Sequence, residues 1–495
     1  MKKIMYITPI ITLIALSSCK TNKVVTNNVI LSSNLDENII LTGDGTFDSG
    51  TKVNVHSKAY LGYLFKGWEV NNKIVSIEEN YEFKMPRKNI SLRAIYELDE
   101  NIKNLVYESD YEKCIVSSVK DKEVTNIIIP EYVTKIEEGA LNGCANLTSL
   151  SIPFIGEENK EPMGGIKYPL GYIFGKDAYE GGVNTFQYYY NSYKDGGTSY
   201  GYINSYNGYI PANLKDITLS NPITITAYAF MNIDINRLYI SNKLVCVDEL
   251  AFANTNIDKI YYKGDIGDLC SIDGYYDSIF NVDANAFYID INNEYQEFPE
   301  ELIIPNSVEE INYSAFKYNT IIKSLEFGTN VKRIREDAFE DAINMVDVYY
   351  NGTLDDWTKI EFEFCTPISY DYNKQTNQPV YRNLYLLDKK GTIKHNGKKY
   401  KKLEGEITLN YISACSFQRA SNITVVRLTD KITCIPEDAF SSSSITEIYI
   451  PASVTEIDRY AFDYCQSLRI IHNASSVNIN KTDFSLEDDV QIVNE

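Results

Sequence analysis

Histidine, a side chain that often serves acid–base catalysis and metal binding, is rare in this sequence and shows no catalytic or metal-binding motif. His56, His395 and His472 are its only histidines, and they lie far apart. Neither the HExxH pattern nor the spacing of a zinc finger occurs, and the segment GDGTFDSG, with Asp44 and Asp48, lacks the acidic spacing of an EF-hand loop. We therefore expect no enzyme, no catalytic residue, no cofactor and no metal site. A glycosidase needs only two carboxylates and leaves no short signature, so this class is kept as a less favoured alternative.

One cysteine stands where a modification is expected. Two lysines precede an apolar run at residues 4–16, and Ser17, Ser18 and Cys19 follow it. This is the pattern of a secretory signal, and the apolar run is shorter than the roughly 20 residues that span a bilayer. The stretch Leu16-Ser17-Ser18-Cys19 resembles the bacterial lipobox. The resemblance implies cleavage before Cys19 and a diacylglyceryl group on its thiol.

The lipobox resemblance also implies where the protein lies. Two acyl chains give stable membrane anchoring, whereas one gives only marginal binding. We expect a signal peptide at 1–18, a polar tether at 19–27, and a chain held on the extracellular face of a bacterial membrane; an ordinary signal peptide with an incidental cysteine is the alternative. Loss of residues 1–18 removes two lysines and moves the formal net charge from −21 to −23. Nucleic acid is therefore not an expected partner, because its binding depends on basic side chains that neutralise phosphates.

Eight further cysteines are dispersed along the chain without a CxxC pair. An exported protein can form disulfides, but dispersed cysteines at repeat positions are more often small buried apolar residues. We expect structural thiols and keep disulfides as the alternative. The eight are Cys114, Cys144, Cys246, Cys270, Cys365, Cys415, Cys434 and Cys465.

Residues 28–98 show the alternation of short strands, with glycines at the expected turns. The run GYLFKGWEV contains the pair Gly67-Trp68, and the segment from Met85 to Ala94 reads MPRKNISLRA. These features resemble the internalin-type B repeat of bacterial surface proteins. The resemblance implies a small β-grasp-like module that serves as a spacer or binding domain.

The rest of the chain is organised by a repeat. Strand segments of the form I-x-I-P are followed at fixed distances by a valine, an isoleucine, an Ala-Phe pair and a leucine. An I-x-I strand points two side chains inward and one outward, and because no single turn can bury its apolar face alone, stacked turns must supply the core. The sequence predicts a mainly β solenoid with short parallel strands and about 22–23 residues per turn over residues 103–480. Its phenylalanines should form a column: Phe252, Phe316, Phe339, Phe440 and Phe462.

The template I-x-I-P...V...I...A-F..C..L resembles the BspA-like leucine-rich repeats of bacterial surface antigens. About nine copies are in register across most of residues 103–475. The resemblance implies a leucine-rich-repeat fold and a cell-surface role in adhesion or in host or matrix interaction. We expect a hairpin at 103–125 to cap one end of the stack and the acidic tail at 481–495 to close the other.

Two kinds of insertion interrupt the repeats. The segment from Tyr261 matches the segment from Tyr349 with an offset of 88, so both should form the same unit. Leu269 and Trp357 occupy equivalent positions in it, and we expect apolar plugs there rather than a ligand-stacking tryptophan. The insertion at 161–210, rich in tyrosine and glycine, is too long for a neutral connector. Tyrosine suits binding loops, but a lobe packed on the solenoid edge is an equal alternative.

The middle residue of each strand should face outward and form a ladder on the stacked sheet. These residues are Ile128, Ser151, Thr218, Tyr239, Tyr261, Ile303, Glu326, Tyr349, Arg427, Tyr449 and Ile471. Tyrosine and arginine are enriched at binding hot spots, although tyrosine also suits exposed strands. The candidate ligand-binding residues are Tyr239, Tyr261, Glu326, Tyr349, Arg427 and Tyr449.

The favoured hypothesis is a cell-surface lipoprotein that binds an extracellular protein or glycan through this ladder and the 161–210 insertion. A structural envelope spacer or a self-assembling surface protein is the alternative. The sequence leaves the ligand, the host, the membrane leaflet and the oligomeric state open.

Overall fold

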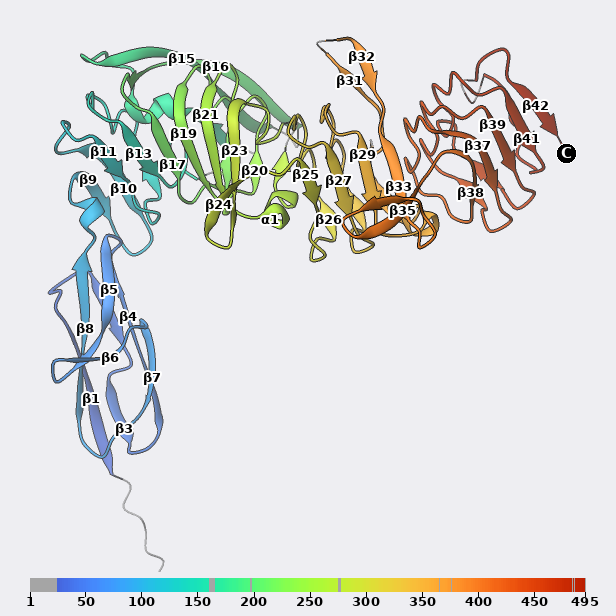
Figure 1. Ribbon diagram of the computed structural model, residues 1–495. Coiled ribbons are helices and arrows are strands. Elements are labelled where there is room, and N and C mark those ends of the chain that lie inside the picture. Colours follow the sequence, from blue (N-terminus) through green and yellow to red (C-terminus); the bar gives the residue numbers. More distant parts are fainter. Residues whose placement is uncertain are drawn as a thin grey trace, which may run out of the picture. The chain divides into compact units, whose positions relative to one another are not determined.

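The computed structural model describes residues 25–495, except 160–164, 196–197, 275–276, 365, 375, 483, 485 and 495. The chain forms two compact units (Figure 1). The first runs to Asp99 and includes Asp110–Glu112, and the second contains Glu100–Ser109 and the residues from Lys113 onward. The expected signal peptide and Cys19 lie outside the described residues. Within them, no helix is long and apolar enough to cross a membrane.

The first unit is a β domain of two sheets, with strand orders β3-β1-β8-β5-β6 and β2-β4-β7. Alternate side chains of its strands point into one core, which includes Val53 and Val55 from β4 and Leu92 and Ala94 from β8. This is the period-two pattern that the sequence showed. The strands are β1 (Thr26–Ser33), β2 (Ile39–Thr42), β3 (Gly45–Asp48), β4 (Lys52–Ala59), β5 (Tyr63–Val70), β6 (Lys73–Ser76), β7 (Asn80–Lys84) and β8 (Ile90–Leu98).

The pair Gly67-Trp68 has a structural reason in this domain. Gly67 has φ of 141°, and a Cβ atom there would lie 2.6 Å from the carbonyl oxygen of Ser76, so only glycine fits. The register of β5 against β8 shifts at this point, as in a β-bulge. Trp68 is fully buried in the core, and its indole N–H donates to the carbonyl of Glu79 at 3.2 Å.

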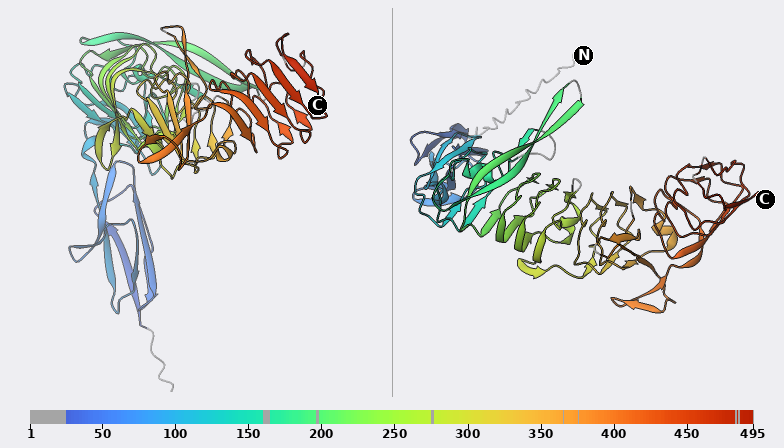
Figure 2. Two further views of the ribbon diagram at one scale, coloured as in Figure 1. Left: turned by 45° about the vertical axis from the view of Figure 1, so that its right-hand side comes forward. Right: turned by 90° about the horizontal axis from the view of Figure 1, so that it is seen from above.

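The second unit is a solenoid whose turns each add one strand to a parallel sheet (Figure 2). The strands form three successive sheets, and we call their solvent side the ladder face. The first contains β11 (Asn126–Ile128), β13 (Ser149–Ile152), β17 (Asp216–Leu219), β19 (Asp234–Ser241), β21 (Asn256–Lys263), β23 (Asp283–Ile291) and β24 (Glu294–Glu297). The second contains β25 (Glu301–Ile303), β27 (Ser324–Phe327), β29 (Asp347–Tyr350), β33 (Asn383–Leu387), β35 (Lys398–Lys402) and β34 (Ile393–His395). The third contains β36 (Gly405–Leu409), β37 (Ile423–Leu428), β39 (Glu447–Ile450), β41 (Ile470–Asn473) and β42 (Gln491–Asn494).

Short strands lie on another side of many of the turns. They pair in parallel as β18-β20-β22, β26-β28-β30 and β38-β40, while β12 joins the opening hairpin. Two-residue ladders suffice there because the core side chains of stacked turns hold the coil together. These strands are β12 (Lys135–Ile136), β18 (Thr224–Ile225), β20 (Cys246–Val247), β22 (Asp273–Gly274), β26 (Glu310–Ile311), β28 (Arg333–Ile334), β30 (Glu361–Phe362), β38 (Cys434–Ile435) and β40 (Glu456–Ile457).

The interior of the solenoid is filled as the repeat predicts. The two flanking residues of each I-x-I strand point inward, as Ile448 and Ile450 do with at most 2% exposure. The phenylalanines stack between turns with nearly parallel rings, and each pair adds about 0.5–1.5 kcal/mol beyond the burial of its area. The centroid separations are 5.6 Å for Phe230 and Phe252, 5.4 Å for Phe316 and Phe339, 5.9 Å for Phe417 and Phe440, and 6.0 Å for Phe440 and Phe462.

The two segments related by an offset of 88 fold alike. Each begins a short helix, α1 (Ile266–Cys270) or α2 (Leu354–Trp357), with a capping box in which the N-cap and N3 side chains bond each other's backbone. Leu269 and Trp357 are both fully buried, which confirms the prediction of apolar plugs. The Trp357 indole also donates to the carbonyl of Ser416 at 3.1 Å.

A β-hairpin forms one end of the stack, and a single strand forms the other. The antiparallel pair β9 (Leu105–Ser109) and β10 (Cys114–Val119) opens it, preceded by the 3-10 helix η1 (Glu100–Ile102). At the other end, β42 pairs in parallel with β41. The inserted elements are β14 (Gly165–Lys167), η2 (Leu170–Phe174), β15 (Gly182–Asp195), β16 (Thr198–Pro211), β31 (Asp371–Asn373) and β32 (Gln378–Val380).

Candidate ligand-binding face

The six candidate residues lie on the ladder face as three neighbouring pairs, one pair in each sheet. Register places Tyr239 beside Tyr261, Glu326 beside Tyr349, and Arg427 beside Tyr449. The structure therefore does not join them into one continuous ladder. Each sheet has to be considered by itself.

In the first sheet, tyrosine rings stack along the ladder face. The ring centroids of Tyr239 and Tyr261 lie 4.7 Å apart, those of Tyr261 and Tyr288 lie 4.8 Å apart, and the ring planes differ by at most 13°. Tyr295, on the returning strand β24, meets Tyr261 edge-on at 5.2 Å. Sequence reasoning missed Tyr288 and Tyr295. The segment Phe287-Tyr288-Ile289 carries the strand pattern, but the α1 insertion displaces it from the 22–23-residue spacing.

An open pocket of about 390 Å³ lies beside these rings. Its walls include Tyr239 and Tyr295, and its polar groups include Glu131, Lys243 and Lys263. Broad aromatic surface beside a few charged groups is the composition of many ligand sites. Partial burial raises the pKa of the Tyr295 phenol, so this group stays a neutral hydrogen-bond donor near pH 7.

In the second sheet, the candidates Glu326 and Tyr349 are covered. Glu326 is 2% exposed and Tyr349 is 9% exposed, because the strands β34 and β35 fold over them. His395 stacks on the Tyr349 ring at 3.8 Å, and Lys398 Nζ lies 2.5 Å from Glu326 Oε1. Neither candidate offers free surface to a ligand in this arrangement.

The Glu326 carboxylate has a full set of partners under this hairpin. Asn351 Nδ2 donates to Oε1 at 3.0 Å, and Asn396 Nδ2 donates to Oε2 at 2.8 Å. Burial alone would raise the pKa of Glu326, but the hydrogen bonds from Lys398, Asn351 and Asn396 outweigh burial and hold that pKa below its usual value. The residue therefore holds the hairpin against the sheet as a charged group.

In the third sheet, Arg427, Tyr449 and His472 follow one another along the ladder face. The Arg427 guanidinium lies 3.7 Å from the Tyr449 ring centroid, and the His472 ring stacks on the other side of Tyr449 at 4.1 Å. The prediction that Ile471 faces outward was wrong by one residue: Ile471 pairs with the core residue Ile448 and is fully buried. His472 takes the outward position because the inward residues of β41 are Ile471 and Asn473, not Ile470 and His472.

The base of the 161–210 insertion packs on the solenoid. All five residues of η2 are buried, and Lys167 Nζ forms a buried ion pair with Asp248 Oδ2 at 2.6 Å. Burial raises the pKa of Asp248, and the Lys167 ammonium offsets part of that rise. Farther along the hairpin, Tyr202 and Ile203 of β16 are 54% and 56% exposed. The packed-lobe alternative therefore describes the base, and the binding alternative concerns the exposed remainder.

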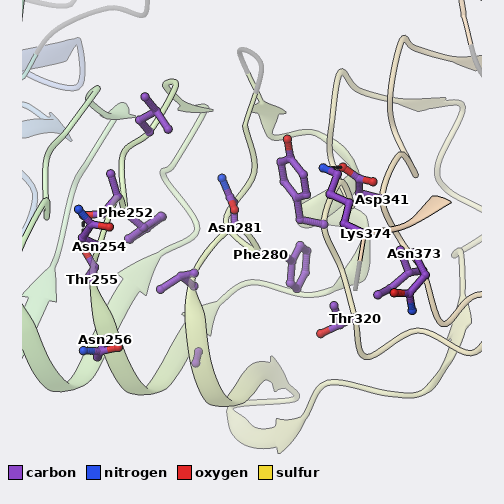
Figure 3. Close-up of a pocket in the computed structure, with 16 residues that line it drawn as sticks. Phe252, Asn254, Thr255, Asn256, Phe280, Asn281, Thr320, Asp341, Asn373 and Lys374 are labelled. Atoms are coloured by element: carbon purple, nitrogen blue, oxygen red, sulfur yellow. Dashed lines mark hydrogen bonds and ion pairs between the residues drawn. The ribbon is translucent and has the colours of Figure 1, made fainter. Parts of the chain in front are cut away.

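A larger concavity of about 880 Å³ is lined by the loop before β21 and by residues of later turns, among them Phe280, Asp341 and Lys374 (Figure 3). Its charged groups pair with each other, since Lys374 Nζ bonds Asp341 Oδ2 at 2.6 Å. Its phenylalanines, Phe252 and Phe280, are at most 9% exposed. The pocket therefore offers less aromatic contact surface than the tyrosines of the first sheet.

The cysteines behave as structural thiols within the described residues. Seven of the eight lie there, none of them in a disulfide, and six of those are buried; Cys365 lies outside them. Burial raises the pKa of Cys114 and of Cys144 to about 11, which keeps them protonated and unreactive near neutral pH. Among the described residues, no group of three or more His, Cys, Asp or Glu side chains could hold a metal ion.

Comparison with known protein families identifies the family to which this architecture belongs. The profile of the BspA type leucine-rich repeat region matches six copies, over residues 68–158, 201–301, 281–378 and 395–492. The chain belongs to the BspA-type leucine-rich-repeat family. Residues 32–100 match the divergent InlB B-repeat domain. Both family resemblances are thus confirmed, although the first repeat match begins inside the small domain, whose last strand ends at Leu98. Neither family description names a catalytic activity.

Solved structures of similar proteins are distant. The pneumococcal vaccine antigen PcpA shares 13% identity, with 83% of this chain and 87% of that chain covered and a TM-score of 0.32. A leucine-rich repeat protein from Bacteroides ovatus shares 14% identity over 79% and 98% of the chains, with a TM-score of 0.30. A leucine rich cell surface protein from Faecalibacterium prausnitzii shares 15% over 78% and 88%, with a TM-score of 0.24. No curated protein matches the chain in sequence. The family assignment rests on the profile matches.

Proposed function

We propose that this protein is a lipid-anchored surface protein that captures an extracellular protein or glycan on the ladder face of its first sheet. The observation that carries the proposal is the stack of Tyr239, Tyr261 and Tyr288, with Tyr295 edge-on beside it. The family to which the chain belongs consists of repeat proteins, and similar solved structures include a pneumococcal vaccine antigen and a leucine rich cell surface protein.

The physical case for binding rests on preorganisation. Tyrosine supplies broad contact area at small conformational cost and keeps a polar tip, and stacking fixes the three rings before a ligand arrives. A ligand that covers them therefore orders few side chains, which reduces the cost of association. Part of the ligand can enter the adjacent pocket, where Lys243, Lys263 and Glu131 are available for polar contacts.

The anchor is part of the proposal. Cys19 follows an apolar run and two serines, and the proposal assigns it a diacylglyceryl group after signal-peptide cleavage. Replacing Cys19→Ser should release the protein from the membrane fraction and abolish incorporation of labelled fatty acid. A variant that stays in the membrane fraction and still incorporates the label would refute this assignment.

The binding site is tested on arrays of extracellular matrix proteins and glycans with the purified full-length protein in detergent. In the test variant, Tyr239 and Tyr261 are both replaced by threonine, which keeps strand propensity. We expect at least a hundredfold loss of affinity for the captured ligand with an unchanged melting temperature. The matched control is Tyr449→Thr on the third sheet, which should bind as the wild type does.

Three outcomes would contradict the proposal. They are the absence of any captured ligand, equal capture by the double variant, and a loss confined to the Tyr449 variant, which would move the site to the third sheet. Concentration-dependent self-association of the wild type, with no ligand captured, would favour the spacer or self-assembly alternative.

A further inference from the structure

The hairpin of β34 and β35 concentrates positive charge on an acidic protein. The whole chain has a formal net charge of −21. Residues 388–402, with the sequence DKKGTIKHNGKKYKK, contain seven lysines against the single carboxylate of Asp388. We call this segment the lysine hairpin; β35 lies beside β33 in the second sheet (Figure 1).

One side of the lysine hairpin is anchored to the ladder face. Tyr400 is fully buried and meets the Tyr349 ring edge-on at 5.1 Å. His395 stacks on Tyr349, and Lys398 bonds Glu326. These contacts fix the position of the hairpin, so its other side is presented on a supported element and not on a loose loop.

The other side presents lysines to solvent. Residues opposite each other on paired strands share a side, and the sides alternate along each strand. Lys394 pairs with Lys399, so these two point away from the sheet together with Lys401. Lys389 and Lys390 continue the charge into the preceding turn. All five are exposed, and within the described part of the chain none of them forms an ion pair.

The row of lysines is electrostatically unfavourable, and within the described residues its side chains form no ion pair that would offset the repulsion. Like charges directly opposite each other on neighbouring strands are destabilising, and Lys394 and Lys399 are such a pair. The anchoring contacts come from the other side of the hairpin. Lys399 and Lys401 are two residues apart on one strand, so their backbones are separated by about 7 Å. The result is a narrow row of ammonium groups suited to a linear chain of negative charges.

We propose that the lysine hairpin binds a sulfated polysaccharide. The choice of an extracellular polymer rests on the proposed surface location, whereas the cationic row itself is independent of the tyrosine stack. A single polysaccharide chain is thin enough to follow the hairpin while staying clear of the acidic remainder of the protein. The sulfates would pair with Lys394, Lys399 and Lys401, and with Lys389 and Lys390 at the turn.

Two other polyanions fit the same row less well. Single-stranded nucleic acid is bound largely by stacking of its bases on aromatic side chains. The two aromatic rings of the hairpin, His395 and Tyr400, instead both lie against Tyr349, and Tyr400 is fully buried. An anionic membrane is a broad plane, so it would bring its charge toward the carboxylates of the surrounding acidic surface as well as toward the lysines. Both classes are included in the test.

The test uses the full-length protein in detergent, immobilised heparin as the probe, and a series of salt concentrations. The variant replaces Lys394, Lys399 and Lys401 by glutamine. We expect affinity to fall at least tenfold and the dependence of log K on log salt to become shallower, because three fewer ions are released. The matched control replaces Lys323, Lys332 and Lys359 by glutamine, which makes the same change in net charge elsewhere on the solenoid.

The outcomes separate this inference from its rivals. Retained binding by the control, loss in the hairpin variant with unchanged melting, and loss on chemical desulfation of the heparin would support it. Absence of heparin binding at 0.15 M salt, equal losses in both variants, or tighter binding to single-stranded DNA or phosphatidylglycerol vesicles would overturn it. The Tyr239 and Tyr261 double variant should still bind heparin, so failure of the tyrosine site and failure of the lysine hairpin are distinguishable.

Discussion

Replacing Glu326→Gln should loosen the lysine hairpin without unfolding the solenoid. The carboxylate accepts from Asn351 at 3.0 Å, from Asn396 at 2.8 Å and from Lys398 at 2.5 Å. Hydrogen bonds to a charged group contribute about 1.5–3 kcal/mol each, and breaking a fully buried ion pair costs about 3–5 kcal/mol. Because the Lys398 side chain is 44% exposed and can regain water, we expect a smaller local loss of about 2–3 kcal/mol. That corresponds to a roughly 30- to 150-fold rise in hairpin opening.

Hydrogen exchange measured by mass spectrometry on peptides covering residues 386–402 is the assay. Their exchange should accelerate by that factor in Glu326→Gln, while peptides of the third sheet exchange as in the wild type. The control is Glu301→Gln, an exposed carboxylate of the same sheet. Rates within twofold of the wild type in the hairpin peptides would refute the assignment of Glu326 as its anchor.

Because Glu326 is ionisable, we expect opening of the lysine hairpin to depend on pH. The pKa of Glu326 is lower in the folded protein, so its contribution is complete above the unfolded-state value of about 4.3 and is lost as pH falls through the folded-state pKa. Once intrinsic exchange rates are corrected for pH, opening should increase in acid for the wild type and change less for Glu326→Gln. An equal acid response in both proteins would contradict this reasoning.

Three further experiments test the packing. Trp357→Ala should lower the free energy of unfolding by about 3–5 kcal/mol, measured by urea denaturation, because it empties a fully buried site; an unchanged midpoint would rule out a plug. Lys167→Met leaves the buried Asp248 carboxylate unpaired, so proteolysis of the 161–210 insertion should become faster, and Asp248→Asn in addition should restore part of the protection; equal digestion of wild type and variants would dismiss the ion pair as an anchor. Cys114 and Cys144 should not react with a thiol reagent in the folded protein and should react once it is unfolded, because burial raises the pKa of both thiols to about 11. Rapid labelling of the folded protein would contradict their burial.

Features that recur within a turn could be predicted from the sequence alone. The spacing of Phe316 and Phe339 predicts their stacking, and the matched positions of Leu269 and Trp357 predict their burial. Both predictions succeed because each turn repeats the same local pattern, and burial of that pattern requires the next turn. The outward direction of Tyr239 and Tyr261 follows from the same period-two geometry.

Features that depend on contacts between distant segments required the tertiary structure. The sequence places Glu326 on the ladder face, but its accessibility is decided by Lys398, which lies 72 residues later. The lysine run was visible in the sequence, yet only the folded hairpin separates its anchoring side from its solvent side. The repeat pattern also placed Ile471 outward, and only the register with Ile448 shows that His472 takes that position.

The sequence by itself determined the repeat, its period, and the side chains that fill the interior, because the same residue pattern recurs in every turn. The tertiary structure decided which parts of the ladder face remain open. Some strands lie outside the repeat pattern and fold back over the sheet. Their positions in the sequence do not follow the repeat spacing, so the repeat does not predict what they cover. They cover Glu326 and Tyr349 in the second sheet. In the first sheet the returning strand β24 brings Tyr295 edge-on to Tyr261, and Tyr239 and Tyr261 stay partly exposed.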